Sequence, residues 1–460
     1  MQNFEVMRYI LSILLVFATC LIGCTSKTKE TIVSSDARVS TFTFQTDTSN
    51  PGLTAVTYTI EHRTDTGLIY CKDSLLFGTR LDSVIPMVTY MATPGIVNFI
   101  LPDTTIISTG VDTMNFEQKP IYLHVKASDM TTEKIYLIDI AAHQADPNLY
   151  VWKCLTENLF APHPIENCET KAFRMHDHLV VYVNNGLATS VYQSTTGEKW
   201  TQVTDRIDAL PVPCHVRDIV QHGDTLYYID GTSLYLSEDL LTWTKRDYTS
   251  AYFTPVNMLL SYAGKAWCIV QDNATEQLML ATISGDSIHI QTDIADLKDG
   301  FLPTNFPISD FAALSFSSSS ERPRAMIVGG RAINGDMVNS RWNLEYTNSK
   351  YRLKDFSISQ PTFKSLVGVS IIQYDNRFIM FGGTDNNLTW RSDILYSTDE
   401  GMNWYTPDTT SNQLPSTYLS RRNQTVIVDE SDNIYIIGGQ SHTQSFGDVY
   451  CGFRNATKWE

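Results

Sequence analysis

The stretch Ile379–Trp404 reads IMFGGTDNNLTWRSDILYSTDEGMNW, and its pattern decides the fold. An apolar run ends in the diglycine Gly382-Gly383, a polar loop follows, and a second apolar run at Tyr396 leads through a turn to Trp404. Glycine lets the backbone reverse with positive φ at no steric cost. Apolar runs separated by Asp, Asn and Gly turns indicate antiparallel strands. The stretch therefore predicts neighbouring strands of one sheet.

The same pattern recurs along the chain at similar intervals. An aromatic residue precedes a tryptophan by eight residues at three places and by nine at a fourth: Tyr192…Trp200, Tyr235…Trp243, Tyr396…Trp404 and Tyr450…Trp459. Four-stranded units that repeat every roughly 40–55 residues are typical of β-propellers. We therefore expect an all-β chain with a six-bladed kelch-like propeller over residues 148–460. Its units lie at about 170–206, 212–249, 254–293, 308–358, 366–410 and 420–460. The repeated Trp and Tyr residues are expected to pack between blades.

The sixth unit ends at Glu460, before a fourth strand can form. Residues 150–156 resemble such a strand, and Pro162 follows them as a proline follows the tryptophan of other units. We expect this strand to complete blade six, which would remove an exposed sheet edge. Cys154 and Cys451 would then lie on neighbouring strands, although we expect the thiols of this chain to stay mostly unpaired.

Residues 34–147 have a different composition, with short alternating strands rich in threonine and β-branched residues. Examples are Val39–Phe44 and Ile121–Val125. Short strands between Pro, Gly and Asp turns predict a small β-sandwich of the immunoglobulin or cadherin kind.

The first residues have the pattern of a secretion signal. Tyr9–Gly23 is an apolar run that follows Arg8 and is too short to span a bilayer comfortably. It ends in Leu21-Ile22-Gly23-Cys24, which resembles a bacterial lipobox. We expect residues 1–23 to be a lipoprotein signal peptide, Cys24 to be lipidated, and residues 24–33 to tether the protein to the outer membrane. Whether the protein faces the periplasm or the cell surface stays open.

The charge of the chain excludes one class of partner. The formal net charge is −16, and no basic stripe interrupts the acidic surface. Such a surface repels the phosphate backbone, so we expect no nucleic-acid partner. The only histidine pair at metal-ligand spacing, His176 and His178, lies in an expected turn, and the sequence predicts neither a metal nor a cofactor.

Several segments resemble one family of bacterial proteins. They are Ser34-Ser35-Asp36-Ala37, Gly67-Leu68-Ile69-Tyr70, Asp73-Ser74-Leu75, Tyr136-Leu137-Ile138-Asp139-Ile140 and Asp146-Pro147…Val151-Trp152. On these residues the chain resembles the DUF6242 family of Bacteroidota lipoproteins. The resemblance implies an N-terminal β-domain, a kelch-like propeller and a location in the cell envelope, and it implies no activity.

An enzymatic alternative rests on the turn Ser397–Trp404, which matches the Asp-box of sialidase-type propellers. An Asp-box stabilises a turn on the face opposite the usual active site. A sialidase would also need three convergent arginines, and only Arg341 and Arg391 fall near equivalent positions. A glycoside hydrolase or lyase thus remains the alternative to a non-catalytic protein, and a structural scaffold is a third reading.

The predicted binding surface is the face built by the loops between second and third strands and by the connections between blades. These segments carry carboxylates, amides, arginines and an aromatic ring, which suit a sugar or a peptide. The candidate ligand-binding residues are Asp336, Arg341, Asp385, Asn386, Trp390, Arg391, Tyr418, Arg421 and His442. The sequence therefore favours a lipid-anchored envelope protein that binds a glycan or a protein partner.

Overall fold

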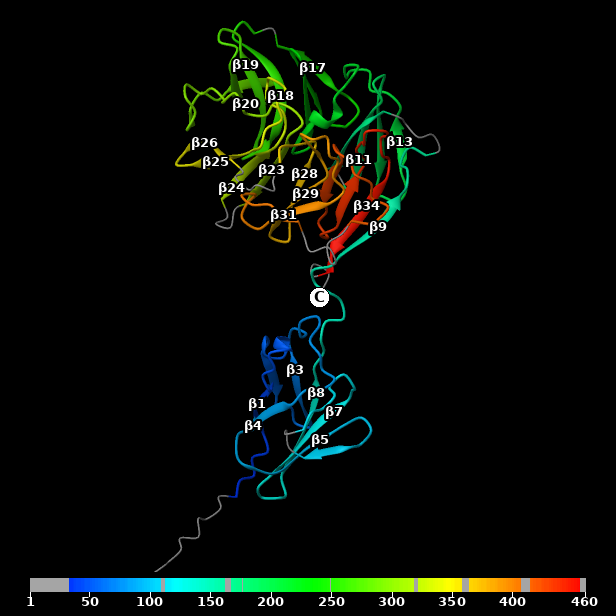
Figure 1. Ribbon diagram of the computed structural model, residues 1–460, viewed down its shortest axis with the longest axis vertical. Coiled ribbons are helices and arrows are strands. Elements are labelled where there is room, and N and C mark those ends of the chain that lie inside the picture. The colour runs from blue at the N-terminus through cyan, green and yellow to red at the C-terminus, as the bar shows by residue number, and fades with distance from the viewer. Residues whose placement is uncertain are drawn as a thin grey trace, which may run out of the picture. The chain divides into compact units, whose positions relative to one another are not determined.

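A computed structural model describes residues 33–108, 112–161, 167–175, 177–248, 250–317, 322–357, 364–406 and 414–455 (Figure 1). The chain forms two compact units, residues 1–145 and 146–460. The expected signal peptide, the lipidation site Cys24 and most of the tether lie outside the described residues, as do His176 and Trp459. Among the described residues, no helix is long and apolar enough to cross a membrane.

The first unit contains two sheets. The larger has the strand order β2 (Tyr58–Glu61), β3 (Thr66–Cys71), β8 (Glu133–Asp139), β7 (Ile121–Ala127), β5 (Pro94–Ile100), β6 (Ile106–Ser108). The pair β3 and β8 is parallel, and the other pairs are antiparallel. The smaller sheet pairs β1 (Val39–Phe44) with β4 (Pro86–Tyr90), and a 3-10 helix, η1, covers Pro51–Thr54.

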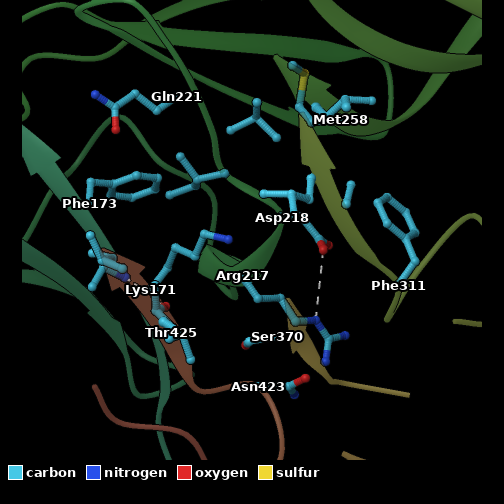
Figure 2. Close-up of a pocket in the computed structure, with 18 of the residues that line it drawn as sticks. Lys171, Phe173, Arg217, Asp218, Gln221, Met258, Phe311, Ser370, Asn423 and Thr425 are labelled. Atoms are coloured by element: carbon cyan, nitrogen blue, oxygen red, sulfur yellow. Dashed lines mark hydrogen bonds and ion pairs between the residues drawn. The ribbon is translucent and has the colours of Figure 1, made fainter. Parts of the chain in front are cut away.

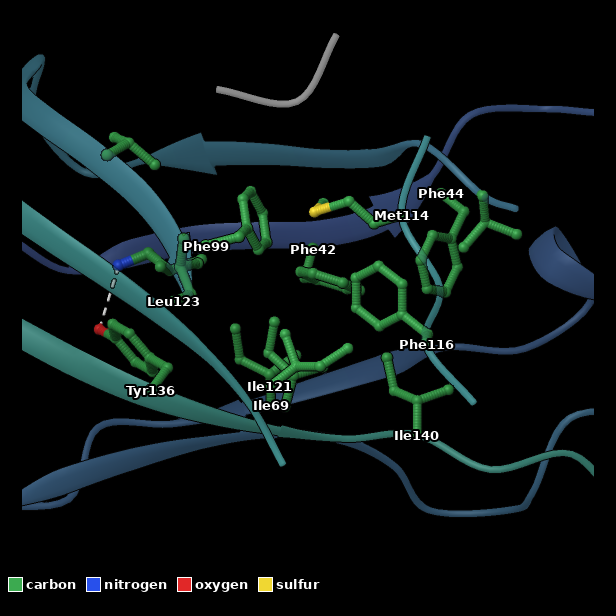
Figure 3. Packing of buried hydrophobic residues seen from close by; sticks show 14 of the residues in the cluster. Phe42, Phe44, Ile69, Phe99, Met114, Phe116, Ile121, Leu123, Tyr136 and Ile140 are labelled. Carbon is green, nitrogen blue, oxygen red and sulfur yellow. Dashed lines mark hydrogen bonds between the residues drawn. The ribbon is translucent and has the colours of Figure 1, made fainter. Parts of the chain in front are cut away.

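One apolar core joins these two sheets because β1 and β7 alternate buried and more exposed side chains (Figure 3). Phe44 and Phe116 meet edge to face, with ring centroids 5.0 Å apart. The hydroxyl of the buried Tyr136 accepts a hydrogen bond from the backbone N–H of Val39 at 3.1 Å. This hydrogen bond connects β1 of the smaller sheet to a side chain of β8 in the larger sheet.

The second unit is a series of mainly antiparallel sheets. Three successive sheets are β10 (Glu169–Met175), β11 (His178–Asn184), β12 (Thr189–Ser194), β13 (Thr201–Thr204); β14 (Val220–His222), β15 (Thr225–Asp230), β16 (Ser233–Ser237), β17 (Thr244–Asp247); and β18 (Phe253–Tyr262), β19 (Lys265–Asp272), β20 (Leu278–Ser284), β21 (Ser287–Ile290). The 3-10 helix η2 (Val216–Asp218) precedes β14.

The later sheets follow the same order with small additions. They are β23 (Ala312–Ser317), β24 (Pro323–Val328), β25 (Ser340–Thr347), β26 (Lys350–Ser357), with β22 (Ile294–Ala295) parallel to β26; β28 (Ser370–Tyr374), β29 (Arg377–Phe381), β31 (Ile394–Ser397); and β32 (Thr425–Val428), β33 (Ile434–Ile437), β34 (Val449–Arg454), β9 (Tyr150–Thr156). A short pair joins β27 (Leu366–Val367) to β30 (Thr384–Asp385).

The first strands of these sheets contact one another in a closed circle. Strand β10 contacts η2, β14 contacts β18, and the contacts continue through β23, β28 and β32 back to β10. The two ends of the unit also meet, because β9 pairs antiparallel with β34, with Lys153 opposite Cys451 and Cys154 opposite Tyr450. Since neighbouring residues of a strand point to opposite faces, Cys154 and Cys451 face away from each other.

The diglycines explain how successive sheets approach so closely. Gly382 and Gly383 have φ of 61° and 94°, which only glycine adopts easily. A Cβ on Gly382 would lie 2.5 Å from the carbonyl oxygen of Arg421, and the Gly383 N–H donates to that oxygen at 2.8 Å. Each diglycine thus lies against the segment that begins the next sheet.

The Asp-box residues build a turn. The hydroxyl of Ser397 accepts a hydrogen bond from the Gly401 N–H at 2.9 Å, and Asp399 accepts one from the Asn403 N–H, also at 2.9 Å. Trp404 packs beneath this turn and is 2% exposed. The motif therefore has a structural role in this chain.

Candidate functional site: the central cavity of the second unit

A cavity of about 460 Å³ opens where the first strands of the sheets converge (Figure 2). Strands β10, β14, β18, β23, β28 and β32 all contribute to its wall, together with the segments that precede several of them. This volume lies within the range of small-molecule pockets. The wall mixes apolar side chains such as Phe173, Met258 and Val426 with polar ones such as Lys171 and Gln221.

Six charged residues gather at the end of the cavity where the first strands begin, and we call them the mouth cluster. They are Glu169, Arg217, Asp218, Asp310, Arg331 and Arg422. An Nη1 atom of Arg217 lies 2.9 Å from a carboxylate oxygen of Asp310 and 3.9 Å from one of Glu169. Asp310 also pairs with Nε of Arg331 at 3.3 Å. The cluster therefore links residues from several sheets across the cavity mouth.

Backbone hydrogen bonds hold the segments that carry this cluster. The Gly368 N–H donates to the carbonyl of Asp310 at 2.9 Å, and the Asn423 N–H donates to the carbonyl of Gly368 at 2.8 Å. A Cβ on Gly368 would lie 2.9 Å from Cβ of Arg422, so only glycine fits there without displacing that arginine. The mouth is thus built on fixed backbone, as a preorganised binding site requires.

Arg422 stands out because it lacks a carboxylate partner. Its guanidinium lies over the Trp390 ring at 5.1 Å from the centroid, and no ion pair joins it to any described residue. Its Nε is buried without a hydrogen-bond acceptor. Burial lowers the pKa of Arg422, while the nearby carboxylate of Asp310 opposes that shift. The side chain keeps its charge and has free donors at the mouth.

Lys171, inside the cavity, is a second cation without an ion-pair partner. Its side chain reaches in from β10, and Arg217 reaches in from the segment before β14 (Figure 2). Within the described parts of the chain, Lys171 makes no hydrogen bond or ion pair. Burial lowers the pKa of Lys171, and the negative charge of Asp218 acts against this. Burial raises the pKa of Asp218, whose carboxylate is 3.9 Å from Nε of Arg217.

Several polar atoms near the mouth are buried without a hydrogen-bond partner. They are Oε2 of Glu169, Nε of Arg217, Nε of Arg422, Nδ2 of Asn423 and Oε1 of Gln424. Most buried polar atoms in proteins are hydrogen-bonded to protein or to ordered water. Their concentration at one cavity mouth is what a site for a polar ligand would show.

None of the residues proposed from the sequence lines the cavity, but Trp390 contacts the mouth cluster through Arg422. Asp385 shapes the loop that carries it, since its carboxylate accepts hydrogen bonds from the N–H groups of Asn387 and Thr389, both at 2.9 Å. Burial raises the pKa of Asp385, but these bonds and Lys364 outweigh it and lower the pKa overall. Asn386 is exposed on the same loop.

Three other proposed residues lie on the loops away from the cavity lining. Arg391 is paired with Asp393, with its Nη2 2.7 Å from a carboxylate oxygen. Asp336 is exposed and accepts a hydrogen bond from Asn334 at 2.7 Å, and His442 is exposed. None of the three lines the cavity.

The remaining three proposed residues are interior. Arg341 is 2% exposed, and burial lowers its pKa to about 10; its Nε lies 3.3 Å from the sulfur of Met326. Arg421 is 0% exposed and Tyr418 is 4% exposed. The two stack on each other at 4.1 Å, and burial raises the pKa of Tyr418. These side chains stabilise the fold and are closed to a ligand.

Sequence reasoning missed the mouth cluster and Lys171. Apart from Arg331, which follows β24, their common signal was position: they lie just before, or near the start of, the first strand of a repeating unit. Superposing the units would have brought these charged positions together.

Comparison with known proteins agrees with this architecture. Residues 146–460 match the family model described as the DUF6242 beta propeller domain, and residues 25–140 match the DUF6242 N-terminal domain, a domain of unknown function. The second unit is therefore a β-propeller, preceded by an N-terminal β-domain. Among solved structures, that of YjhT aligns with a TM-score of 0.41 and 12% identity, over 64% of this chain and 96% of that chain. No curated protein matches the chain.

Proposed function

This chain belongs to the DUF6242 family, and from that premise we propose that it is a lipid-anchored binding protein of the cell envelope. Its propeller would bind a glycan, or a polar segment of an envelope protein, at the mouth of the central cavity. The observation that carries the proposal is the convergence of unsatisfied buried polar atoms on that mouth. A ligand would supply their missing partners, as ordered water would in its absence.

The chemistry of the mouth supports a glycan first. Sugars present many hydroxyl groups, which both donate and accept hydrogen bonds, and the unsatisfied atoms include donors on Arg217, Arg422 and Asn423 and acceptors on Glu169 and Gln424. Trp390 adds an aromatic ring at the rim. Orienting polar groups around a concave site is how small-molecule pockets gain specificity.

The finer architecture belongs to this proposal as well. We infer six blades, because the contacts of the first strands pass through six sheets before they return to β10. The two facing sheets of the first unit support a sandwich of the immunoglobulin or cadherin kind. The lipid anchor at Cys24 rests on the lipobox-like sequence alone.

A thermal-shift screen tests the proposal directly. Protein from Thr25 to Glu460 retains every described residue, and it would be incubated with glycans, peptidoglycan fragments and envelope peptides. A bound ligand raises the apparent stability by mass action. We expect a shift that Trp390→Ala weakens, with the glycan intact afterwards.

Two other results would redirect the proposal. Cleavage of the bound glycan, detected by mass spectrometry of the products, would establish a hydrolase or lyase in place of a binding protein. A screen without any shift, repeated at several pH values, would contradict a small-ligand site and favour a scaffold.

A further inference from the structure

We propose that the ligand of the central cavity carries carboxylate groups, and that Arg422 at the mouth and Lys171 inside the cavity bind them. This inference rests on the proposed function, because it names the chemical class of the ligand at that same site. The ligand class that fits is an acidic sugar, such as a uronate-containing oligosaccharide.

The charge balance at the mouth is the first argument. The mouth cluster itself is neutral, with Arg217, Arg331 and Arg422 against Glu169, Asp218 and Asp310, and Lys171 inside the cavity adds one positive charge. The whole chain has a net charge of −16. A cationic site at the centre of an acidic protein is most simply explained by an anionic ligand.

The second argument is how the carboxylates are already used. Asp310 is shared between Arg217 and Arg331, at 2.9 and 3.3 Å. Glu169 faces His215 at 3.3 Å and Arg217 at 3.9 Å. Asp218 lies 3.9 Å from Arg217, and its charge also acts on Lys171. Arg422 and Lys171 are the two cations of the site that form no ion pair with a described residue, and their donors are available to an incoming anion.

The geometry of Arg422 favours a carboxylate over other anions of similar size. A guanidinium presents a planar set of N–H donors that matches the two oxygens of a carboxylate. The Trp390 ring below Arg422 restricts the orientation of that plane, which reduces the entropy lost on binding. The hydroxyl groups of the same sugar would satisfy Asn423 Nδ2 and Gln424 Oε1.

Lys171 would act inside the cavity, where its side chain is half-buried. Its ammonium has three donors and no described partner, and the apolar strand surfaces around it strengthen attraction to an anion. A ligand that reaches from Arg422 at the rim to Lys171 inside would occupy the mouth and the upper part of the cavity.

The test compares matched acidic and neutral ligands. Protein from Thr25 to Glu460 would be assayed on an array of oligosaccharides with carboxylate-bearing sugars of several kinds, each beside its methyl ester, and the hits measured by calorimetry. We expect the acid to bind at least tenfold more tightly than its ester. Arg422→Gln and Lys171→Met should each weaken the acid at least tenfold and leave the ester unchanged, whereas the exposed control Arg246→Gln should change neither.

The outcomes separate this inference from the proposed function. If glycans bind but the esters bind as tightly as the acids, the inference of a carboxylate-bearing ligand is refuted, and the proposed binding function stands. If neither acids nor esters bind, this inference is refuted, and the envelope peptides of the thermal-shift screen then decide whether the proposed function stands. If acids bind preferentially but the affinity is unaffected by Arg422→Gln and by Lys171→Met, the assignment to this cavity is wrong.

Discussion

The guanidinium of Arg421 forms a bidentate ion pair with the carboxylate of Asp448, with Nη2 2.9 Å from one oxygen and Nη1 hydrogen-bonded to the other. The aromatic rings of Tyr418 and Phe446 enclose it at 4.1 and 3.9 Å, and carbonyl oxygens of Leu419 and Gly438 accept its remaining donors. The pair ties the segment before β32 to the segment before β34. Arg421 is thus a structural residue of the last sheet.

Replacement of Arg421 should destabilise the propeller and spare ligand binding. Arg421→Leu leaves the partly buried carboxylate of Asp448 without its cation, a loss that typically costs about 3–5 kcal/mol. Urea unfolding would measure the change, and Arg391→Ala is the control, because an exposed ion pair contributes about 0–1 kcal/mol. An Arg421→Leu protein of unchanged stability that no longer binds ligand would show that Arg421 serves the ligand after all.

A disulfide between β9 and β34 should close the ring covalently. Lys153 lies opposite Cys451 in this strand pair, so Lys153→Cys in a Cys154→Ser background places two thiols at facing positions. The bond would span almost the whole propeller, and such long loops give up to about 5 kcal/mol of stabilisation. The melting temperature of the oxidised protein should exceed that of the same protein after reduction. Failure of these cysteines to join under oxidising conditions would argue against the pairing.

Removal of the Trp390 ring should weaken binding with little effect on stability. The ring is half-buried at the rim and supports Arg422, and a cation–π contact is worth roughly 0.5–2 kcal/mol. Trp390→Ala should therefore reduce ligand affinity by about fivefold or more in calorimetry, and Trp390→Phe should retain part of it. Asn386→Ala, on the same loop, is the matched control. If the three variants bind the ligand as tightly as the wild-type protein, Trp390 is not part of the binding site.

Lys171 should lower the stability of the propeller in a pH-dependent way. Because burial lowers its pKa in the folded protein, the unfolded chain binds the proton at a higher pH than the fold does. Stability therefore falls as the pH decreases below the pKa of the unfolded amine. Lys171→Met should raise the melting temperature, more at pH 7 than at pH 10.5. A gain that is the same at both pH values would mean that the amine titrates normally in the fold.

The nucleophilicity of Lys171 offers an independent check on the same shift. A lysine with a lowered pKa holds more neutral amine at pH 8 and so reacts faster with small amine reagents. Reductive methylation with formaldehyde, followed by peptide mass spectrometry, should modify Lys171 before the exposed Lys199. Protection of Lys171 by a bound acidic glycan would also locate the ligand.

The lipid anchor predicts where the protein is found in the cell. If Cys24 is acylated, the native protein should enter the detergent phase of a Triton X-114 extraction, since each buried CH₂ of an acyl chain contributes about 0.8 kcal/mol. Cys24→Ser should move it to the aqueous phase. Detergent partitioning that survives this substitution would exclude lipidation at Cys24.

The repeat pattern predicted the strands well because local chemistry determines them. Alternating apolar residues, Gly382-Gly383 and the turn at Asp399 each act within a few residues of the chain. The same locality explains Trp404, whose spacing from Tyr396 reflects a turn of fixed length. The family of the chain was also evident from short segments spread over both units.

The site was harder to predict because it depends on contacts between distant units. Nothing in the sequence near Arg421 indicates that Asp448 and two aromatic rings enclose it, and so a buried structural arginine resembled a loop residue open to ligand. Arg341 was also proposed as a ligand-binding residue, although it is buried, because its burial depends on contacts that the local sequence does not reveal. Conversely, Lys171 lies in the alternating pattern of a strand, and its importance follows only from the convergence of the first strands on one cavity.

A crystal structure of the protein bound to the glycan found in the thermal-shift screen tests the central claim most directly. We predict density for the sugar in the central cavity, with its carboxylate within hydrogen-bond distance of Arg422 and its ring near Trp390. A ligand bound on the outer strands or on the N-terminal domain, with the cavity filled only by water, would contradict the account.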